Sequence, residues 1–374
     1  MNERLIYSNT ILDSLNEGVY VCDRDRTITY WSKGAERITG WAPQDVVGHR
    51  CLDGVLCHVD KDGHALCGEE HCPLHRAMVT GSGSTVPIIV FALGKSGMRI
   101  PMQVSVAPIF DESGEVIGGV ESFRDMSAAL SDLERARRIQ ALTMEHDLPD
   151  DPRIRFWASY TPQDIVGGDY YAIRRLDEDR YGFMLADVMG HGTSAALHTI
   201  HLGTLWSRHS DLLVSPSEFA RTINNDLGRV VKYESFATAT CGVIDAQART
   251  LEMVSAGGAP ILLFHANGDV SELNGNNPPF GLREDLDFEE VSAALERDDC
   301  LLMLSDGAYE IHDAAGTMLG VSGLVEMLEQ RGYPGVDFGD IAQGIEVDLL
   351  KYSNDIRLVD DLTFIEVRFC ARQP

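Results

Sequence analysis

The chain has 374 residues, of which 44% are hydrophobic and 24% charged, a composition typical of a globular protein with two or three domains. Its formal net charge of −27 argues against binding to nucleic acid or to an anionic membrane surface, because both need clustered Lys and Arg. The charge would suit a metal-dependent enzyme or a protein with a basic partner.

No apolar run is long enough to cross a membrane, and the first residues contain acids in place of the apolar core of a signal peptide. Eight cysteines in a chain without an export signal predict reduced thiols. We therefore expect a cytoplasmic protein with no membrane partner.

Residues 1–125 are expected to form the first domain. The stretch "EGVYVCDRDRTITYWSKGAERITGW" predicts a strand, a polar turn, a second strand and a short helix. A later stretch, "RIPMQVSVAPIFDESGEVIGGVESFRD", predicts two strands around a turn at Gly114. With "VVGHR" between them, these pieces resemble in their order a PAS sensor domain.

A cysteine- and histidine-rich insert, residues 51–77, lies inside this domain. It holds Cys51, Cys57, Cys67 and Cys72, with four histidines among them. Thiolates and imidazoles so concentrated are candidate ligands for a metal such as Zn²⁺, for haem iron or for an iron–sulfur cluster, or candidates for a redox-switched disulfide. No Cys-x-x-Cys pair is present, so the simpler alternative is a partly buried helical insert with reduced thiols.

Residues 126–148 are expected to link the two domains. They contain no Gly or Pro up to residue 147, which predicts a helix. Apolar residues recur at intervals of three (Leu130, Leu133, Ala136 and Ile139). The helix is interpreted as a signalling linker that dimerises the chain, or alternatively as a plain spacer.

Residues 149–374 are expected to form the second domain, an α+β sandwich. Consecutive strands without intervening helices predict antiparallel sheets with helices packed outside them. Strands are expected at 181–187, 236–244, 250–255, 260–265, 300–305 and 362–369, and helices at 193–208, 216–232, 321–331 and 338–351. In the first of these helices, the expected core stripe is Leu197, Ile200, Thr204 and Leu205.

Four acidic positions of the second domain each lie at a strand end or in a glycine turn. They are Asp169 in "VGGDYY", Asp187 in "LADVMGHG", Asp306 in "MLSDGAYE", and the pair Asp360 and Asp361 in "VDDLTFIEV". Mg²⁺ and Mn²⁺ prefer oxygen ligands of this kind. Any one of these acids alone is more typical of a turn or a helix cap. Four such sites in one domain favour a metal centre.

These motifs, with "ADVMGHGTSAAL" and "FATATCGVIDAQARTLEMVSAGGAP", resemble the bacterial serine/threonine phosphatases of the PPM (PP2C-like) class, nearest to the RsbU and SpoIIE type. The resemblance covers nearly the whole second domain. It implies a pair of Mn²⁺ or Mg²⁺ ions that activate water for attack on phosphorus, without a protein nucleophile.

The resemblance also assigns ligands. Asp187 would bridge the two ions and the Val188 carbonyl would bind one of them. Asp306 and Asp360 would bind the other, with Asp361 as the alternative to Asp360.

Asp169 would act near the metals, directly or through water, so Asp169 and Asp187 are the candidate catalytic residues. His191, in the turn after Asp187, is interpreted as a structural residue or alternatively as a general acid.

The sequence therefore predicts a sensor-controlled, homodimeric phosphatase. The implied substrate is a phosphorylated anti-anti-sigma protein of the STAS type. Two alternatives are a catalytically silent scaffold with the same fold and a metal-dependent hydrolase of another phosphoester, such as a nucleotide.

Overall fold

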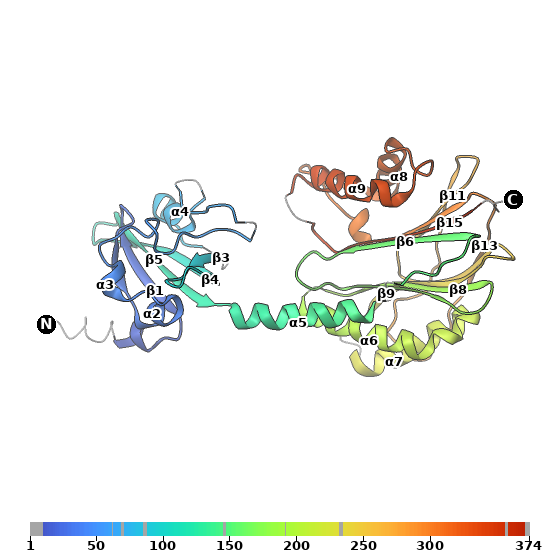
Figure 1. The fold of residues 1–374 in the computed structure, drawn as a ribbon, viewed down its shortest axis with the longest axis horizontal. Coiled ribbons are helices and arrows are strands. Elements are labelled where there is room, and N and C mark those ends of the chain that lie inside the picture. The colour runs from blue at the N-terminus through green and yellow to red at the C-terminus, as the bar shows by residue number, and fades with distance from the viewer. Residues whose placement is uncertain are drawn as a thin grey trace. The chain divides into compact units, whose positions relative to one another are not determined.

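The computed structural model describes residues 10–61, 63–68, 71–84, 88–144, 147–190, 192–231, 235–355 and 358–370. The chain divides into two compact units, Met1–Asp132 and Leu133–Pro374 (Figure 1). Across the described ranges, no helix is both long and apolar enough to cross a membrane.

The first unit is built on one antiparallel five-stranded sheet in the order β2-β1-β5-β4-β3. In the described residues the helices α2, α3 and α4 follow β2 and precede β3, and the turns at Gly97 and Gly114 join the last three strands. The elements are β1 (Gly18–Asp23), β2 (Ile28–Trp31), α2 (Lys33–Thr39), α3 (Pro43–Val46), α4 (Pro73–Thr80), β3 (Ile88–Leu93), β4 (Arg99–Phe110) and β5 (Val116–Asp125).

Local sequence explains where the α2 helix begins and ends. The Ser32 side chain accepts a hydrogen bond from the Ala35 N–H, which satisfies one of the free donors at the helix start. Gly40 follows the last turn with a φ of 74°, a left-handed conformation that glycine adopts without strain. The cap places this short helix against β1, where Ala35 is buried.

The cysteine-rich insert supplies part of the core of the first unit. Cys51 and Cys72 are buried, Cys57 and Cys67 are half-buried, and all eight cysteines of the chain are free thiols. Within the described residues, no three Cys, His, Asp or Glu side chains lie together as metal ligands. Residues 62 and 69–70 of the insert lie outside the residues that the structure describes.

The second unit contains two antiparallel sheets of five strands each, in the orders β13-β10-β9-β8-β7 and β12-β11-β14-β15-β6 (Figure 1). The strands of the first sheet are β7 (Asp169–Arg175), β8 (Arg180–Val188), β9 (Ala237–Asp245), β10 (Thr250–Ala256) and β13 (Val291–Ala294). Those of the second are β6 (Ile154–Thr161), β11 (Ile261–Phe264), β12 (Val270–Leu273), β14 (Cys300–Leu304) and β15 (Leu362–Phe369).

Helices cover the outer faces of both sheets. Contacts join α6 (Thr193–His209) to β7 and β8, and α7 (Pro216–Val231) to β9 and β10. On the other sheet, α8 (Gly320–Gln330) and α9 (Phe338–Ser353) pack in one apolar cluster with residues of β11, β14 and β15. The expected sandwich of antiparallel sheets flanked by helices is confirmed.

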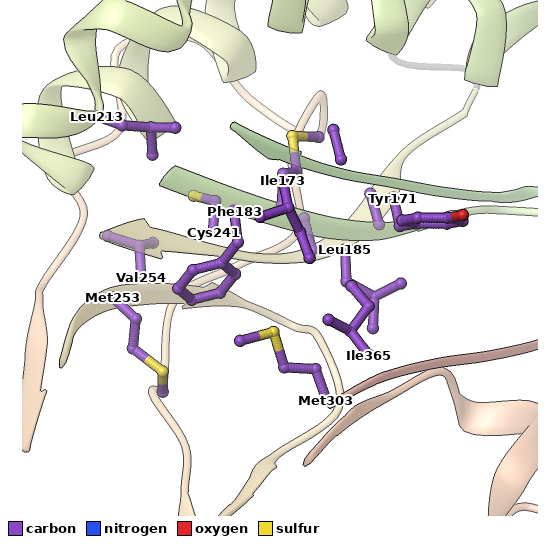
Figure 2. Close-up of a cluster of buried hydrophobic side chains, with 14 of the residues drawn as sticks. Tyr171, Ile173, Phe183, Leu185, Leu213, Cys241, Met253, Val254, Met303 and Ile365 are labelled. Atoms are coloured by element: carbon purple, nitrogen blue, oxygen red, sulfur yellow. The ribbon is translucent and has the colours of Figure 1, made fainter. Parts of the chain in front are cut away.

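The main core of this unit fills the space between the sheets. Figure 2 shows Phe183 and Leu185 of one sheet in a cluster with Met303 and Ile365 of the other. All are nearly inaccessible to solvent, and such close-packed interiors resist local movement. The packed strands therefore provide firm supports for the acidic residues at their ends.

The linker helix α5 (Ser127–Thr143) spans the boundary between the two units. Leu130, Leu133 and Ala136 are partly buried, whereas Ile139 is 52% and Leu142 is 85% exposed. The apolar stripe of the helix is therefore only partly covered within one chain.

Candidate metal centre

Asp169 and Asp187 lie directly opposite each other on neighbouring antiparallel strands. Asp169 is the first residue of β7, and Asp187 is next to the last residue of β8. Residues paired in this way across a sheet have their β-carbons about 5 Å apart. The sheet register thus brings together two acids that are 18 positions apart in the sequence.

Oxygen atoms of the β8 end converge on Gly168. A β-carbon at position 168 would lie 2.9 Å from the Val188 carbonyl oxygen, 3.1 Å from Asp187 Oδ1 and 3.2 Å from the Gly190 carbonyl oxygen. Any residue other than glycine would therefore crowd these three oxygens. The glycine leaves a space lined by one carboxylate and two carbonyls.

The second sheet contributes Asp306, Asp360 and Asp361 at its edge. Asp306 opens a single 3-10 turn, η2 (Asp306–Ala308), one residue after the end of β14, and the acid pair directly precedes the neighbouring strand β15. Because β14 and β15 are antiparallel, the end of one adjoins the start of the other. Residues 54 positions apart in the sequence thus meet at one edge.

Two adjoining hollows connect these acids. A hollow of about 160 Å³ is lined by Asp187, Asp306 and Glu310, among other residues. A second hollow, of about 290 Å³, is lined by Asp306, Glu310 and Asp360, with His312 at its wall. Asp306 and Glu310 therefore lie between Asp187 on one sheet and Asp360 on the other.

Asp360 and Asp361 have different environments. Asp361 is 5% exposed, and its carboxylate accepts hydrogen bonds from the backbone N–H groups of Gln163, Gly168 and Asp169. Asp360 is exposed and lines the larger hollow. The geometry thus favours Asp360 as a ligand and Asp361 as the anchor of the glycine loop.

The acids at the site repel each other. The pKa of Asp187 is raised to about 8, first by burial and then by Asp306 and Asp360 among other acids. Burial followed by Glu310 raises the pKa of Asp306. Burial followed by Asp187 raises the pKa of Asp169, whose carboxylate accepts a hydrogen bond from the Thr363 hydroxyl. A cation in the hollows would relieve this repulsion.

The donor groups of the two hollows fit Mn²⁺ or Mg²⁺. Apart from His312 at the wall of the larger hollow, the lining offers carboxylates and main-chain carbonyls and no thiolate, which suits hard cations. In the described residues, no three acidic, histidine or cysteine side chains are already close enough to hold an ion. Bound ions would therefore combine one or two carboxylates each with carbonyls and water, as Mg²⁺ commonly does in proteins.

Sequence reasoning did not identify three residues at or beside this site. Glu310 and His312 line the hollows, and Gln140 of α5 lies behind the glycine loop. Glu310 could have been found from its place four residues after Asp306. In the turn, the backbone N–H of Glu310 donates a hydrogen bond to the Asp306 carbonyl oxygen. His191 lies outside the described residues.

Comparison with known proteins supports the folds of the two units. The family model "PAS fold" matches residues 12–130. The structure of the SiaA-PP2C domain of Pseudomonas aeruginosa matches with a TM-score of 0.56 at 21% identity, covering 66% of this chain and 100% of that domain. The second unit therefore has the PP2C fold.

Two curated relatives come from Bacillus subtilis (strain 168). Phosphoserine phosphatase RsbP is 31% identical over 183 residues, which is 48% of this chain and 45% of RsbP. Phosphoserine phosphatase RsbU is 22% identical over 306 residues, which is 82% of this chain and 88% of RsbU. The match thus spans less than half the length of RsbP but most of RsbU.

The strongest assignment comes from the family model for Stage II sporulation protein E (SpoIIE), which matches residues 177–370. These are 194 of the 374 residues, just over half of the chain. They include Asp187, Asp306 and Asp360. The chain belongs to the SpoIIE family.

Proposed function

We propose that this chain is a metal-dependent protein serine/threonine phosphatase. The observation that carries the proposal is that Asp187, Asp306 and Asp360, from two sheets, line two adjoining hollows together with Glu310. The two relatives named phosphoserine phosphatases support the same activity.

The residues of the site would hold two ions. We assign Asp187 as the bridge, with the Val188 carbonyl beside it, and Asp306 with Asp360 to the second position. Two bound Mn²⁺ or Mg²⁺ ions would supply an activated water and offset charge on the phosphoryl oxygens. Asp361 holds the glycine loop in place, and buried Asp169, opposite Asp187 in the sheet, would act near the ions directly or through water.

The substrate we propose is a phosphorylated STAS-type anti-anti-sigma protein. Support comes from the resemblance of the motifs to phosphatases of the RsbU type. The open hollows also leave room for a phosphorylated side chain presented by a protein surface. Eight free thiols are in keeping with action in the reducing cytoplasm.

We also propose a homodimer whose sensor unit acts through α5. Ile139 and Leu142 are exposed apolar side chains on this helix, and the same helix contacts the glycine loop through Gln140. A second copy covering the stripe would remove this apolar surface from water.

The test measures release of phosphate by the full chain with Mn²⁺, with Asp306→Asn as the blank. The substrates are a STAS domain phosphorylated on serine, an unrelated phosphoserine peptide and a set of nucleotides. We expect the STAS protein to be hydrolysed fastest. If only nucleotides are hydrolysed, the result supports the alternative that the chain is a hydrolase of another phosphoester. If no substrate is hydrolysed with Mn²⁺, the result supports a catalytically silent scaffold.

A further inference from the structure

One oxygen of a carboxyl group and one nitrogen of an imidazole lie without hydrogen-bond partners in the interior of the described part of the first unit. Glu121 of β5 is 1% exposed and His58 is 4% exposed. His58 Nε2 and Glu121 Oε1 are 3.6 Å apart, beyond hydrogen-bonding distance, and neither atom has another partner among the described residues. Leaving such groups unpaired inside a protein costs stability, so native structures rarely keep them without a role.

The surroundings do little to compensate a charge on this pair. The Tyr20 hydroxyl on β1 donates to Glu121 Oε2 at 3.3 Å, and the cation that acts on His58 is Arg99 of β4. The other titratable groups that face Glu121 are the thiols of Cys22, Cys51 and Cys67, with Cys72 beside them. Neutral thiols are only weak hydrogen-bond donors.

This environment favours the uncharged forms of both groups. Burial raises the pKa of Glu121 to about 8, although the Tyr20 hydroxyl opposes the shift. Burial and then Arg99 lower the pKa of His58 to about 4. At neutral pH the imidazole is therefore neutral, with one N–H, and the proton that titrates near pH 8 is held on the carboxyl group.

The spacing allows two arrangements of the pair. A movement of less than 1 Å would bring the protonated carboxyl into hydrogen-bonding distance of the unprotonated imidazole nitrogen. Loss of the proton removes that donor and leaves a buried carboxylate that accepts a hydrogen bond from the Tyr20 hydroxyl. A closed arrangement is then no longer favoured, and water entry becomes favourable.

The position of Glu121 connects the pair to the linker. Glu121 lies opposite Tyr20 on one neighbouring strand and opposite Val106 on the other, so β5 is central in the sheet. β5 ends at Asp125, and its carboxylate accepts a hydrogen bond from the Ser127 N–H at the start of α5. A displacement at Glu121 therefore lies four residues from the end of the strand that leads into the linker helix.

We propose that Glu121, with His58 as its partner, is a proton-binding site that makes the first unit a pH sensor. When the carboxyl is protonated, the pair is closed; when the proton leaves to solvent as pH rises, the pair opens and β5 shifts. The proton site stands independently of the phosphatase activity, and only its effect on turnover rests on the proposed function.

Infrared spectroscopy of the full chain tests the site directly. The carboxylic acid C=O band is followed from about pH 6 to about pH 9 in the wild type and in Glu121→Gln, with Glu115→Gln, an exposed residue of the β4–β5 turn, as control. Asp187 also contributes to the band in this range, so the signal is the difference between the wild type and each variant. We expect a component lost with a midpoint near 8 that is missing in Glu121→Gln and retained in Glu115→Gln. An equal loss of the band in the wild type and in Glu121→Gln would overturn the proposal, as would a Glu121 carboxyl already ionised at about pH 6.

Tyr20→Phe is a second variant that keeps the ring and removes the hydroxyl donor to the carboxylate. The midpoint should rise by about 0.5–1 pH unit, because the charged form loses a hydrogen bond. A midpoint that stays or falls would contradict the assignment. Turnover measured over the same pH range then reports on the link to the enzyme. If the chain has no phosphatase activity, the infrared result still decides the proton site.

Discussion

The Gln140 side chain joins the linker helix to the glycine loop that precedes Asp169. Its Nε2 atom donates to the Gly167 carbonyl oxygen and to the Thr199 hydroxyl, each at 2.7 Å, and the side chain is 2% exposed. The next residue, Gly168, donates to the Asp361 carboxylate. A short chain of hydrogen bonds thus runs from α5 to the candidate metal centre.

Gln140→Leu should weaken this connection. The variant keeps a similar volume but leaves the Gly167 carbonyl without its side-chain donor, at a cost of about 1–3 kcal/mol. We expect a several-fold higher Mn²⁺ concentration for half-maximal turnover. The control is Arg138→Ala, an exposed position of the same helix. Unchanged Mn²⁺ dependence and stability in Gln140→Leu would contradict the coupling.

Asp187→Asn and Asp306→Asn should abolish turnover without unfolding the protein. Both acids have raised pKa values in the metal-free chain because burial and neighbouring acids oppose their charge, so neutral amides relieve repulsion. Thermal unfolding without metal should show a Tm equal to or above that of the wild type. The control is Glu329→Gln, which removes one negative charge at an exposed position on α8 and should leave the protein active. Near wild-type turnover in either Asp variant at saturating Mn²⁺ would refute its role as a ligand.

The neighbouring acids Asp360 and Asp361 should give opposite phenotypes. Asp361→Asn places an amide among three backbone N–H donors, so we expect a loss of about 2 kcal/mol in the free energy of unfolding. Asp360→Asn should keep its stability and lose Mn²⁺ affinity. Denaturant unfolding and calorimetric Mn²⁺ titration of both variants make the comparison. The reverse pattern would exchange the roles of the two residues.

Mn²⁺ affinity should increase with pH up to about 8. The pKa of Asp187 is raised to about 8, so below that pH the metal-free residue holds a proton that an ion must displace. Calorimetry in two buffers of different ionisation enthalpy should therefore detect proton release on binding below about pH 8, and less release above it. Equal affinity at about pH 6.5 and at about pH 8.5 would show that Asp187 is already ionised in the metal-free protein.

The exposed stripe of α5 supports a prediction about assembly. A double change, Ile139→Glu with Leu142→Glu, should convert the expected homodimer to a monomer in light scattering, because it places charges in the apolar contact. Arg137→Glu with Arg138→Glu, at exposed polar positions of the same helix, should remain dimeric. A monomeric wild type at high micromolar concentration would remove the basis for this proposal.

Most of the second unit could be predicted from the sequence because its strands are short apolar runs bounded by turn residues. The expected strands at 181–187 and 362–369 match β8 and β15 within two residues at each end. The core stripe of α6 was predicted incorrectly at two positions. Leu197 is 59% exposed and Thr204 is exposed, whereas the small residues Ala195, Ala196 and Gly203 are buried against the sheet. Hydrophobicity does not reveal which face of a helix rich in small residues packs closely.

The division of roles within the site was beyond sequence reasoning. Asp360 and Asp361 are adjacent in the chain, and only the backbone donors of residues 163–169, nearly 200 positions away, separate their roles. Gln140 and Glu121 likewise appear as ordinary polar residues in the sequence. Their burial and partners depend on contacts between distant elements.

The most direct test of the central claim is the number of Mn²⁺ ions bound per chain, measured together with turnover of a phosphoserine substrate. We predict that the metal-stripped full chain is inactive and binds two ions, and that activity appears as the second ion binds. Asp306→Asn should bind fewer ions and remain inactive. Full turnover in the metal-stripped chain, or full activity in Asp306→Asn, would contradict the assignment of these acids as a two-metal phosphatase centre.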